Sequence, residues 1–307
     1  MTPMAYPRSA EQHGVALILV LWILALMTIM AGSFALSTQR ETSLVTNARE
    51  RARAVALADG GIHYAMFMLS LPNAADRWRA DGTPYRLRLG GIPVEVRIYD
   101  EAGKIDLNAA QESTLRTFLA KLTRDEDQAV TLSDAIFDWR DNDDLKRLSG
   151  AEAADYRAAG LAQSPQNRNF LVLEELRGVF GMTPSLYRNF EPYFTLYNNV
   201  DGINPAKASR TVLLALTDGD VQAVDSYIAA RETATGNAPP PPIPAVPGIR
   251  FHSFGNSVYT IYARPLSQNH SEPPTMAVVR REAGRPATTP FVFLRWKPQA
   301  IGVTFNP

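Results

Sequence analysis

The side chains that could carry chemistry are concentrated in one acidic stretch of this 307-residue sequence. Asp141, Asp143, Asp144 and Glu152 stand at positions one, three, four and twelve of a twelve-residue window. An EF-hand places oxygens at positions one, three, five and twelve and a glycine at six, whereas a leucine and a lysine stand at five and six here. Two interpretations stay open from the residues alone. The window is either a solvated acidic turn balanced by neighbouring basic residues, or an irregular site for a hard cation, which needs several oxygens within about 2.5 Å.

Enzymatic chemistry has little support elsewhere in the sequence. There is no cysteine, and none of the four histidines falls between residues 100 and 200, so a two-metal hydrolytic centre would lack partners near the acids. No serine-elbow, Walker or HExxH pattern is present. Thirty-one basic residues balance thirty-one acidic ones, which argues against a strongly basic nucleic-acid binder. We predict a protein that is not an enzyme.

An uninterrupted apolar segment lies near the N-terminus. Residues 14–39 contain no ionisable side chain, and residues 15–35 form a helix long enough to span roughly 30 Å of hydrocarbon. The apolar region of a secretory signal peptide is only about 7–15 residues long, so we predict a transmembrane helix over 15–36. The flanking arginines are Arg8 before it and Arg40, Arg49, Arg51 and Arg53 after it. By the positive-inside rule, this distribution favours a cytoplasmic C-terminal part.

The helical pattern continues beyond the apolar segment without a linker. Apolar residues at spacings of three, four or seven share one face, whereas Gly60-Gly61 should weaken the helix and Pro72 should end it. The members of this face are Leu44, Ala48, Ala52, Val55, Ile62, Met66 and Leu69.

The rest of the chain combines early and late strands with a helical region between them. Alternating residues predict a hairpin of strands 85–89 and 92–99 around Gly90-Gly91, and late strands at 258–263, 276–281 and 291–296. We therefore predict an α+β fold, in which one antiparallel sheet packs on the N-terminal helix and is interrupted by an α-helical insertion over 104–250.

The insertion contains a faint internal repeat. Residues 105–110 and 203–206 each lead into an apolar helix, with Asn108 and Asn204 at the expected N-cap positions. The repeat predicts two small helical units, followed by an extended proline-rich connector at 237–248. Two such units also resemble helix-hairpin-helix DNA binders, which makes DNA binding or uptake the alternative function. The acids around Lys104 and Lys207 disfavour phosphate binding.

A resemblance to a known family rests on the leader and on an ordered series of motifs. A short polar leader that ends in Gly14, followed at once by the apolar helix, resembles the type IV pilin-like proteins. Most pilins carry a glutamate at the fifth mature position, where this sequence has Leu19. In lacking this glutamate, the sequence is similar to minor pseudopilin K of type II secretion systems. The matching segments are DEAGKIDLNAA (100–110), LSDAIFDWRDNDD (132–144), GAEAADY (150–156), EELRGVFGM (174–182), YFTLY (193–197) and INPAKASRTVLLAL (203–216).

The resemblance implies a fold and a domain order. The expected fold is a pilin-like long N-terminal helix packed on an antiparallel sheet, with a large SAM-like helical insertion. The expected order is a prepilin leader (1–14), a transmembrane helix (15–36), the pilin-like helix with the first strands (37–103), the insertion (104–250) and the returning strands (251–307).

The resemblance also implies a function and partners. The expected protein is a minor pseudopilin at the tip of the type II secretion pseudopilus, which initiates or caps its assembly for protein export. Prepilin peptidase is expected to cleave between Gly14 and Val15. The mature chain would cross the inner membrane once, with its C-terminal part in the periplasm, and bind the minor pseudopilins I and J; no nucleic acid is expected. Calcium is implied as a cofactor held by Asp141, Asp143, Asp144 and Glu152, with Asn167 as a further amide oxygen and Asp138 as a substitute ligand.

Overall fold

The structure is a computed structural model, and it describes residues 13–233, 248–253, 255, 257–266, 273–282 and 290–298. The chain forms two units, residues 1–53 and 54–307, and each is described by itself. The proline-rich connector predicted at 237–248 lies outside the described residues, apart from its last glycine.

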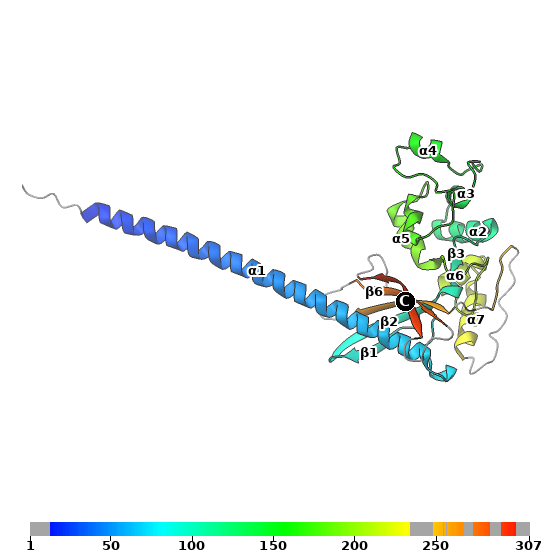
Figure 1. Ribbon diagram of the computed structural model, residues 1–307, viewed down its shortest axis with the longest axis horizontal. Helices are drawn as coiled ribbons and strands as arrows, with labels where there is room; N and C mark the ends of the chain where they lie inside the picture. The colour runs from blue at the N-terminus through cyan, green and yellow to red at the C-terminus, as the bar shows by residue number, and fades with distance from the viewer. Residues whose placement is uncertain are drawn as a thin grey trace, which may run out of the picture. The chain divides into compact units, whose positions relative to one another are not determined.

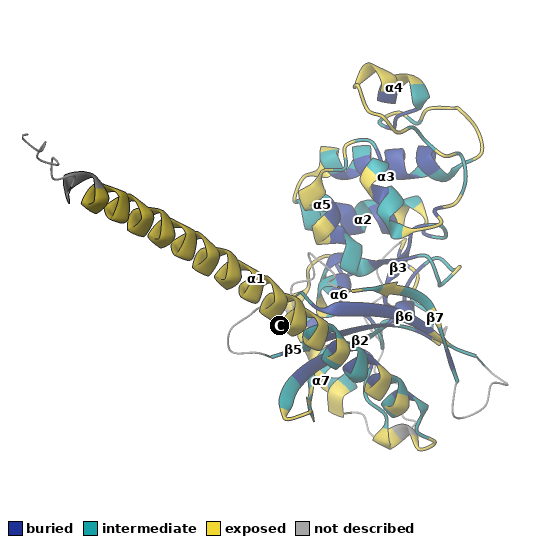
Figure 2. Cartoon of the chain, turned by 60° about the vertical axis from the view of Figure 1, so that its left-hand side comes forward, coloured by how far each residue is buried: buried dark blue, intermediate teal, exposed yellow. Residues whose placement is uncertain are grey.

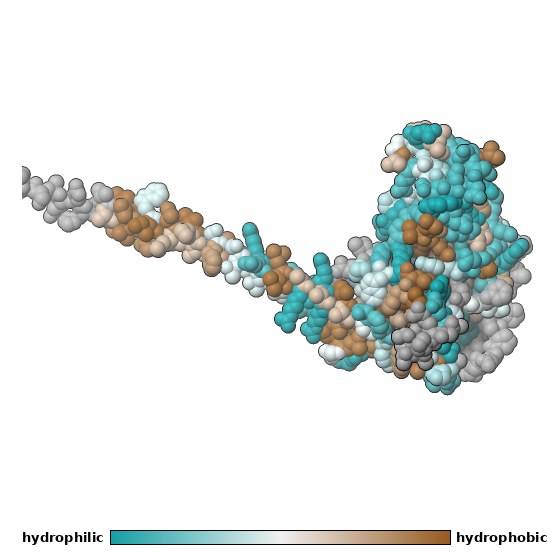
Figure 3. Space-filling model, viewed as in Figure 1, coloured by the Kyte–Doolittle hydropathy of each residue, from teal (hydrophilic) through white to brown (hydrophobic). Residues whose placement is uncertain are grey.

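The first element is α1 (His13–Ser70), a single unbroken helix (Figure 1). Among the described residues it is the one helix long and apolar enough to cross a membrane, and its most apolar window has a mean hydropathy of 2.5. Apolar residues gather on its first half (Figure 3). Leu44, Ala48 and Ala52 are exposed, so the predicted apolar face is covered only in its later part.

The later part of α1 packs on the sheet. Ala58, Ile62, Ala65 and Leu69 are buried there, as the colour change along the helix shows (Figure 2). The helix runs through Gly60-Gly61 without a break. A Cβ atom on Gly61 would lie 3.0 Å from a methyl of Val94, so the missing side chain lets the helix backbone approach the sheet closely.

The sheet has five strands in the order β1-β2-β5-β6-β7, and all neighbours are antiparallel. Gly90 and Gly91 join β1 to β2 with φ values of +55° and +82°, which a two-residue hairpin turn requires. The predicted strands are confirmed, and so is the α+β class. The strand bounds are β1 (Tyr85–Leu89), β2 (Ile92–Asp100), β5 (Val258–Pro265), β6 (Thr275–Arg281) and β7 (Phe291–Lys297).

The chain between β2 and β5 forms the helical insertion. Its two helical units share one hydrophobic core, built around side chains such as Phe118, Trp139 and Phe194. A short parallel strand pair joins the two helical units of the insertion. The sequence pattern did not predict this pair. The helices are α2 (Glu112–Thr123), α3 (Glu126–Arg140), α4 (Ala153–Ala158), α5 (Pro184–Phe190), α6 (Arg210–Leu216) and α7 (Val221–Thr233). The strand pair is β3 (Ile105–Asp106) with β4 (Phe194–Thr195), and the short 3-10 turns are η1 (Ala74–Asp76), η2 (Glu101–Gly103), η3 (Leu173–Gly178) and η4 (Glu191–Tyr193).

The predicted N-caps at Asn108 and Asn204 are wrong. The N-cap residue of α2 is Gln111, and that of α6 is Ser209, whose hydroxyl accepts a backbone N–H of the first turn. Asn108 instead exchanges two hydrogen bonds with the backbone of Phe170, at 3.0 and 2.8 Å. The turns that follow both asparagines delay the helices by several residues.

Asp106 is the residue that organises the start of the insertion. Its buried carboxylate accepts the N–H groups of Asn108 and Ala109 through one oxygen, at 2.8 and 3.1 Å. The other oxygen accepts the N–H groups of Asn198 and Asn199, both at 2.9 Å. One carboxylate thus ties the first helical unit to the chain that leads into the second.

The junction between the sheet and the insertion is a buried polar cluster. Lys104 Nζ lies 2.5 Å from Glu101 Oε1, and the Thr260 hydroxyl of β5 donates to the same oxygen at 2.6 Å. The Asn198 amide donates to the backbone carbonyls of both Glu101 and Lys104. Because each buried charge has several partners, the cluster fixes the insertion against the central strand without an unpaired ion.

Gly103 provides a test of this junction. A Cβ atom there would overlap the backbone carbonyl of Lys207. Gly103→Ala should therefore lower the free energy of unfolding by about 1–3 kcal/mol, as overpacking does. Urea unfolding followed by circular dichroism measures the change, with Gly255→Ala as the matched control because its Cβ would meet nothing within 4 Å. Equal stability of the two variants would contradict the tight junction.

Candidate functional site

The acidic loop lies between α3 and α4 and is fixed at both ends. Asp141 is the C-cap residue of α3, and its N–H donates to the carbonyl of Phe137 at 3.0 Å. Glu152 is the N-cap residue of α4, and its N–H donates to the Asp155 carboxylate at 2.9 Å. The two ends of the predicted cation site are therefore held by helix termini.

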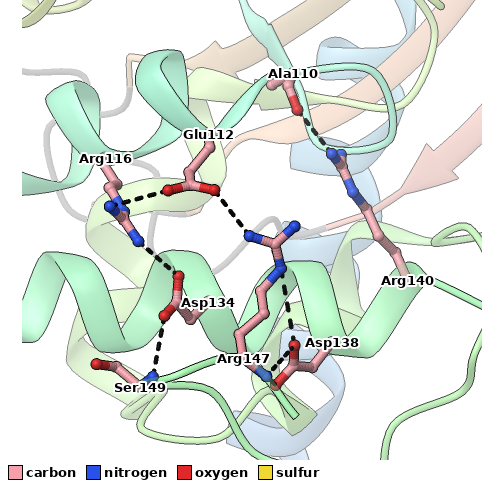
Figure 4. A network of polar contacts seen from close by, with 8 residues as sticks. All are labelled: Ala110, Glu112, Arg116, Asp134, Asp138, Arg140, Arg147 and Ser149. Carbon is pink, nitrogen blue, oxygen red and sulfur yellow. Dashed lines mark hydrogen bonds and ion pairs between the residues drawn. The ribbon is translucent and has the colours of Figure 1, made fainter. Parts of the chain in front are cut away.

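A charged network beneath the loop fixes its second half (Figure 4). Arg147 of the loop pairs with Glu112 at 2.8 Å, Glu112 pairs with Arg116 at 2.9 Å, and Arg116 pairs with the buried Asp134 at 2.9 Å. Asp134 in turn accepts the N–H of Ser149 at 3.1 Å. The network links α2, α3 and the loop, so the loop backbone is positioned by the two helices below it.

Asp138 lies fully buried at the centre of this arrangement. Its carboxylate accepts the Arg147 N–H, at 3.3 Å to each oxygen. A Cβ atom on Gly150 would overlap the same carboxylate, which explains the glycine. Burial, followed by the negative charge of Asp141, raises the pKa of Asp138 to about 6.

Three of the five predicted ligands carry buried oxygens. One oxygen of Asp141 and the amide oxygen of Asn167 have no hydrogen-bond partner among the described residues, and the Glu152 carboxylate lies against the backbone N–H groups at the start of α4. Buried polar groups are nearly always hydrogen-bonded. The buried oxygens of this short stretch and its neighbouring loop are therefore placed to accept a cation or a hydrogen-bond donor.

The other two predicted ligands are exposed and take local roles. Asp143 accepts the N–H of Leu145 at 2.9 Å and closes a turn. Asp144 accepts the side-chain N–H of Asn167 at 2.9 Å, and the same amide donates to the Asp143 carbonyl at 3.1 Å. Asn167 has a φ of +48°, a conformation that asparagine tolerates better than most residues. It thereby brings its loop against the acidic one.

Burial and mutual repulsion hold the carboxylates of the loop partly protonated. Burial, followed by the charges of Asp138, Asp141 and Asp144, raises the pKa of Glu152 to about 7. Burial and Asp143 also raise the pKa of Asp141. A cation at the centre of these carboxylates would favour their ionised forms.

The donor set suits calcium rather than a transition metal. All the candidate ligands are carboxylate or amide oxygens, which calcium prefers in flexible arrangements of six to eight ligands. Among the described residues, no group of three or more acidic, histidine or cysteine side chains has the arrangement of a formed metal site. A bound cation would therefore have to draw the acids together and recruit the amide oxygen of Asn167.

Comparisons with known proteins find matches to one protein family. Residues 97–199 match the family model "Type II secretion system (T2SS), protein K". Type II secretion system protein K of Pseudomonas aeruginosa is 27% identical over 243 residues, which cover 72% of each chain. That of Klebsiella pneumoniae is 27% identical over 290 residues, which cover 85% of this chain and 86% of the relative.

The chain is similar to type II secretion system protein K over most of its length. Its fold resembles that of a chain in the crystal structure of the GspK-GspI-GspJ complex of enterotoxigenic Escherichia coli. The TM-score is 0.58 at 16% identity, over 84% of this chain and 98% of the other. Protein K is a pseudopilin with a structural, non-enzymatic role, in line with the prediction from the sequence.

The raised pKa values of the acidic loop lead to a pH-dependent prediction. The Glu152 pKa of about 7 lies above the ordinary 4.5. In chelator the folded chain thus holds a proton that the unfolded chain has released between those values, so stability should fall as pH rises from about 4.5 to 7. Glu152→Gln removes this titration and should be more stable than wild type in chelator at pH 8, but should gain less from calcium.

Melting curves at pH 5 and pH 8, with chelator and with millimolar calcium, measure this difference. Glu126→Gln is the matched control, because Glu126 is exposed at the start of α3. If Glu152→Gln and Glu126→Gln show the same pH and calcium responses, Glu152 is not a buried carboxylate with a raised pKa.

Proposed function

We propose that the chain is a minor pseudopilin at the tip of the type II secretion pseudopilus, where it initiates or caps assembly. The observation that carries the proposal is α1. Its first part is an uncharged apolar helix with exposed side chains, whereas its later part is the core helix of the sheet. Such a helix can be held by a bilayer and then, after extraction, by the apolar helices of other subunits.

The leader supports processing by prepilin peptidase. Gly14 precedes the apolar run, so cleavage after it would start the mature chain at Val15 and place Leu19 at the fifth position. In pilin-like filaments the glutamate at this position pairs with the N-terminal amine of the preceding subunit. A carboxylate inside a membrane is costly unless it is paired, so an apolar residue suits a subunit with no predecessor. Leu19 therefore suits the first subunit of the filament.

The proposed location is the inner membrane, with one transmembrane helix and the C-terminal part in the periplasm. The apolar first half of α1 supports the single span. The arginines that follow it favour the opposite orientation by charge alone. The similarity to type II secretion system protein K is what supports the periplasmic side, since a pseudopilin assembles there.

The proposed partners are the minor pseudopilins I and J. The fold resembles that of a chain crystallised with GspI and GspJ. On α1, Leu44 and Val45 are 69% and 64% exposed, although both lie beyond the predicted span of 15–36. Exposed apolar residues on a helix outside the bilayer fit a surface that partner helices cover.

We further propose that calcium stabilises the acidic loop. Glu152, Asp141 and the amide oxygen of Asn167 would hold the ion, with Asp143 and Asp144 as outer ligands or through water. Their buried oxygens and raised pKa values support this assignment. Bound calcium would neutralise the clustered carboxylates and cross-link the loop to the segment that carries Asn167, so its role would be structural.

Reconstitution tests the proposed assembly. A soluble fragment from Arg40 should co-purify with soluble forms of pseudopilins I and J at micromolar concentrations. Leu44→Asp places a charge on the proposed contact face and should weaken recovery about tenfold or more, whereas Glu41→Gln, on an exposed position of the same helix, should not. Failure of three folded proteins to associate, or equal recovery of both variants, would contradict the tip assembly.

A further inference from the structure

A pocket lies at the junction of the sheet and the insertion, away from the acidic loop. Its volume is about 390 Å³, within the range of about 300–1,000 Å³ that is usual for small-ligand sites. Strand residues such as Tyr99 and Tyr262 form one side, and Tyr193 and Lys207 of the insertion form the other. Pockets between two structural parts of a chain are a common location for ligand sites.

The basic residues that line this pocket differ in whether they already have a partner. Three of the four are engaged by carboxylates at ion-pair distance. Lys207 is half-buried and forms no hydrogen bond from its ammonium and no ion pair with the residues that the structure describes. The engaged pairs are Arg97 with Glu95 at 3.3 Å, Lys104 with Glu101 at 2.5 Å, and Arg210 with Asp225 at 2.7 Å.

The two acids that line the pocket are also engaged. Asp81 pairs with Arg79 at 2.7 Å. Asp100 is buried and accepts the Ala102 N–H at 3.0 Å. Burial raises the pKa of Asp100, and the Lys207 charge is the strongest influence in the opposite direction. Lys207 therefore acts on Asp100 through its charge, while its ammonium makes no direct hydrogen bond or ion pair with the described residues.

The chemistry of the walls selects the kind of ligand. Three tyrosine rings provide flat, partly apolar surfaces with a hydroxyl at the end, and such side chains are enriched where proteins contact other chains. One available ammonium matches a single negative charge. A phosphate dianion would call for a guanidinium fork or several free cations, whereas the arginines here are engaged.

We propose that the pocket between the sheet and the insertion binds a carboxylate carried by a peptide segment, with Lys207 as its counter-ion and the tyrosine side chains as its walls. Either an acidic side chain or the C-terminal carboxylate of another chain supplies this group. The proposal is independent of the tip assembly and of the calcium site, because it involves neither α1 nor the acidic loop.

Calorimetric titration of the full-length chain in detergent micelles tests the proposal with three short peptides. Ac-Gly-Glu-Gly-amide carries only a side-chain carboxylate, Ac-Gly-Gly-Gly carries only a C-terminal carboxylate, and Ac-Gly-Gln-Gly-amide carries neither. At least one of the first two should bind, and the third should bind at least tenfold more weakly. Which of the two binds better identifies the source of the carboxylate.

Variants of Lys207 link the binding to the pocket. Lys207→Gln should weaken the bound peptide about tenfold, as loss of one charge-assisted contact predicts, and Lys207→Arg should restore most of the affinity. Lys121→Gln, in which the lysine pairs with Asp218 on the insertion surface, should leave it unchanged. Absence of binding by both carboxylate peptides, equal binding of the neutral peptide, or equal affinity of Lys207→Gln and wild type would overturn the proposal.

Discussion

The point at which the insertion leaves the sheet is the constraint on which the rest of the structure depends. The chain departs at the end of β2 and returns at β5, and these strands are direct antiparallel neighbours, with Asp100 opposite Tyr259. The two ends of a large helical region are thereby fixed about one strand spacing apart, roughly 5 Å. The buried Glu101–Lys104–Thr260 cluster and the contact at Gly103 make this junction rigid. The insertion can consequently carry its own core without disturbing the sheet.

The acidic loop depends on that separate core. Trp139 stacks on Phe170 and lies against Tyr156, so the helix before the loop and the segments after it are anchored by aromatic packing. The charged network from Arg147 to Asp134 adds a second anchor. Buried carboxylates that repel one another are unfavourable on their own, and the surrounding packing is what allows the loop to keep them. Local violations of this kind are typical of functional sites.

Local patterns in the sequence were sufficient for most of the fold. Alternating residues identified the hairpin and the late strands, because one face of each strand is buried against α1. The acids were recognisable from their density, and Asn167 from resemblance to the family.

Long-range contacts were not recognisable: Asn108 bonds to Phe170, and Asp106 to Asn198, across more than sixty and ninety residues respectively. The role of Gly61 in close packing was likewise not recognisable, because the strand that approaches it is distant in sequence. The residues that line the pocket around Lys207 come from both the sheet and the insertion, so no single sequence motif identifies the pocket.

The central claim is that α1 is a pilin-like assembly helix whose mature form begins after Gly14. The measurement that tests it most directly is the intact mass of the chain isolated from membranes of cells that contain prepilin peptidase. The account predicts a mass that starts at Val15, and a full-length precursor for Gly14→Val, since a branched side chain would obstruct the peptidase. A native N-terminus elsewhere than Val15, or normal processing of Gly14→Val, would contradict it.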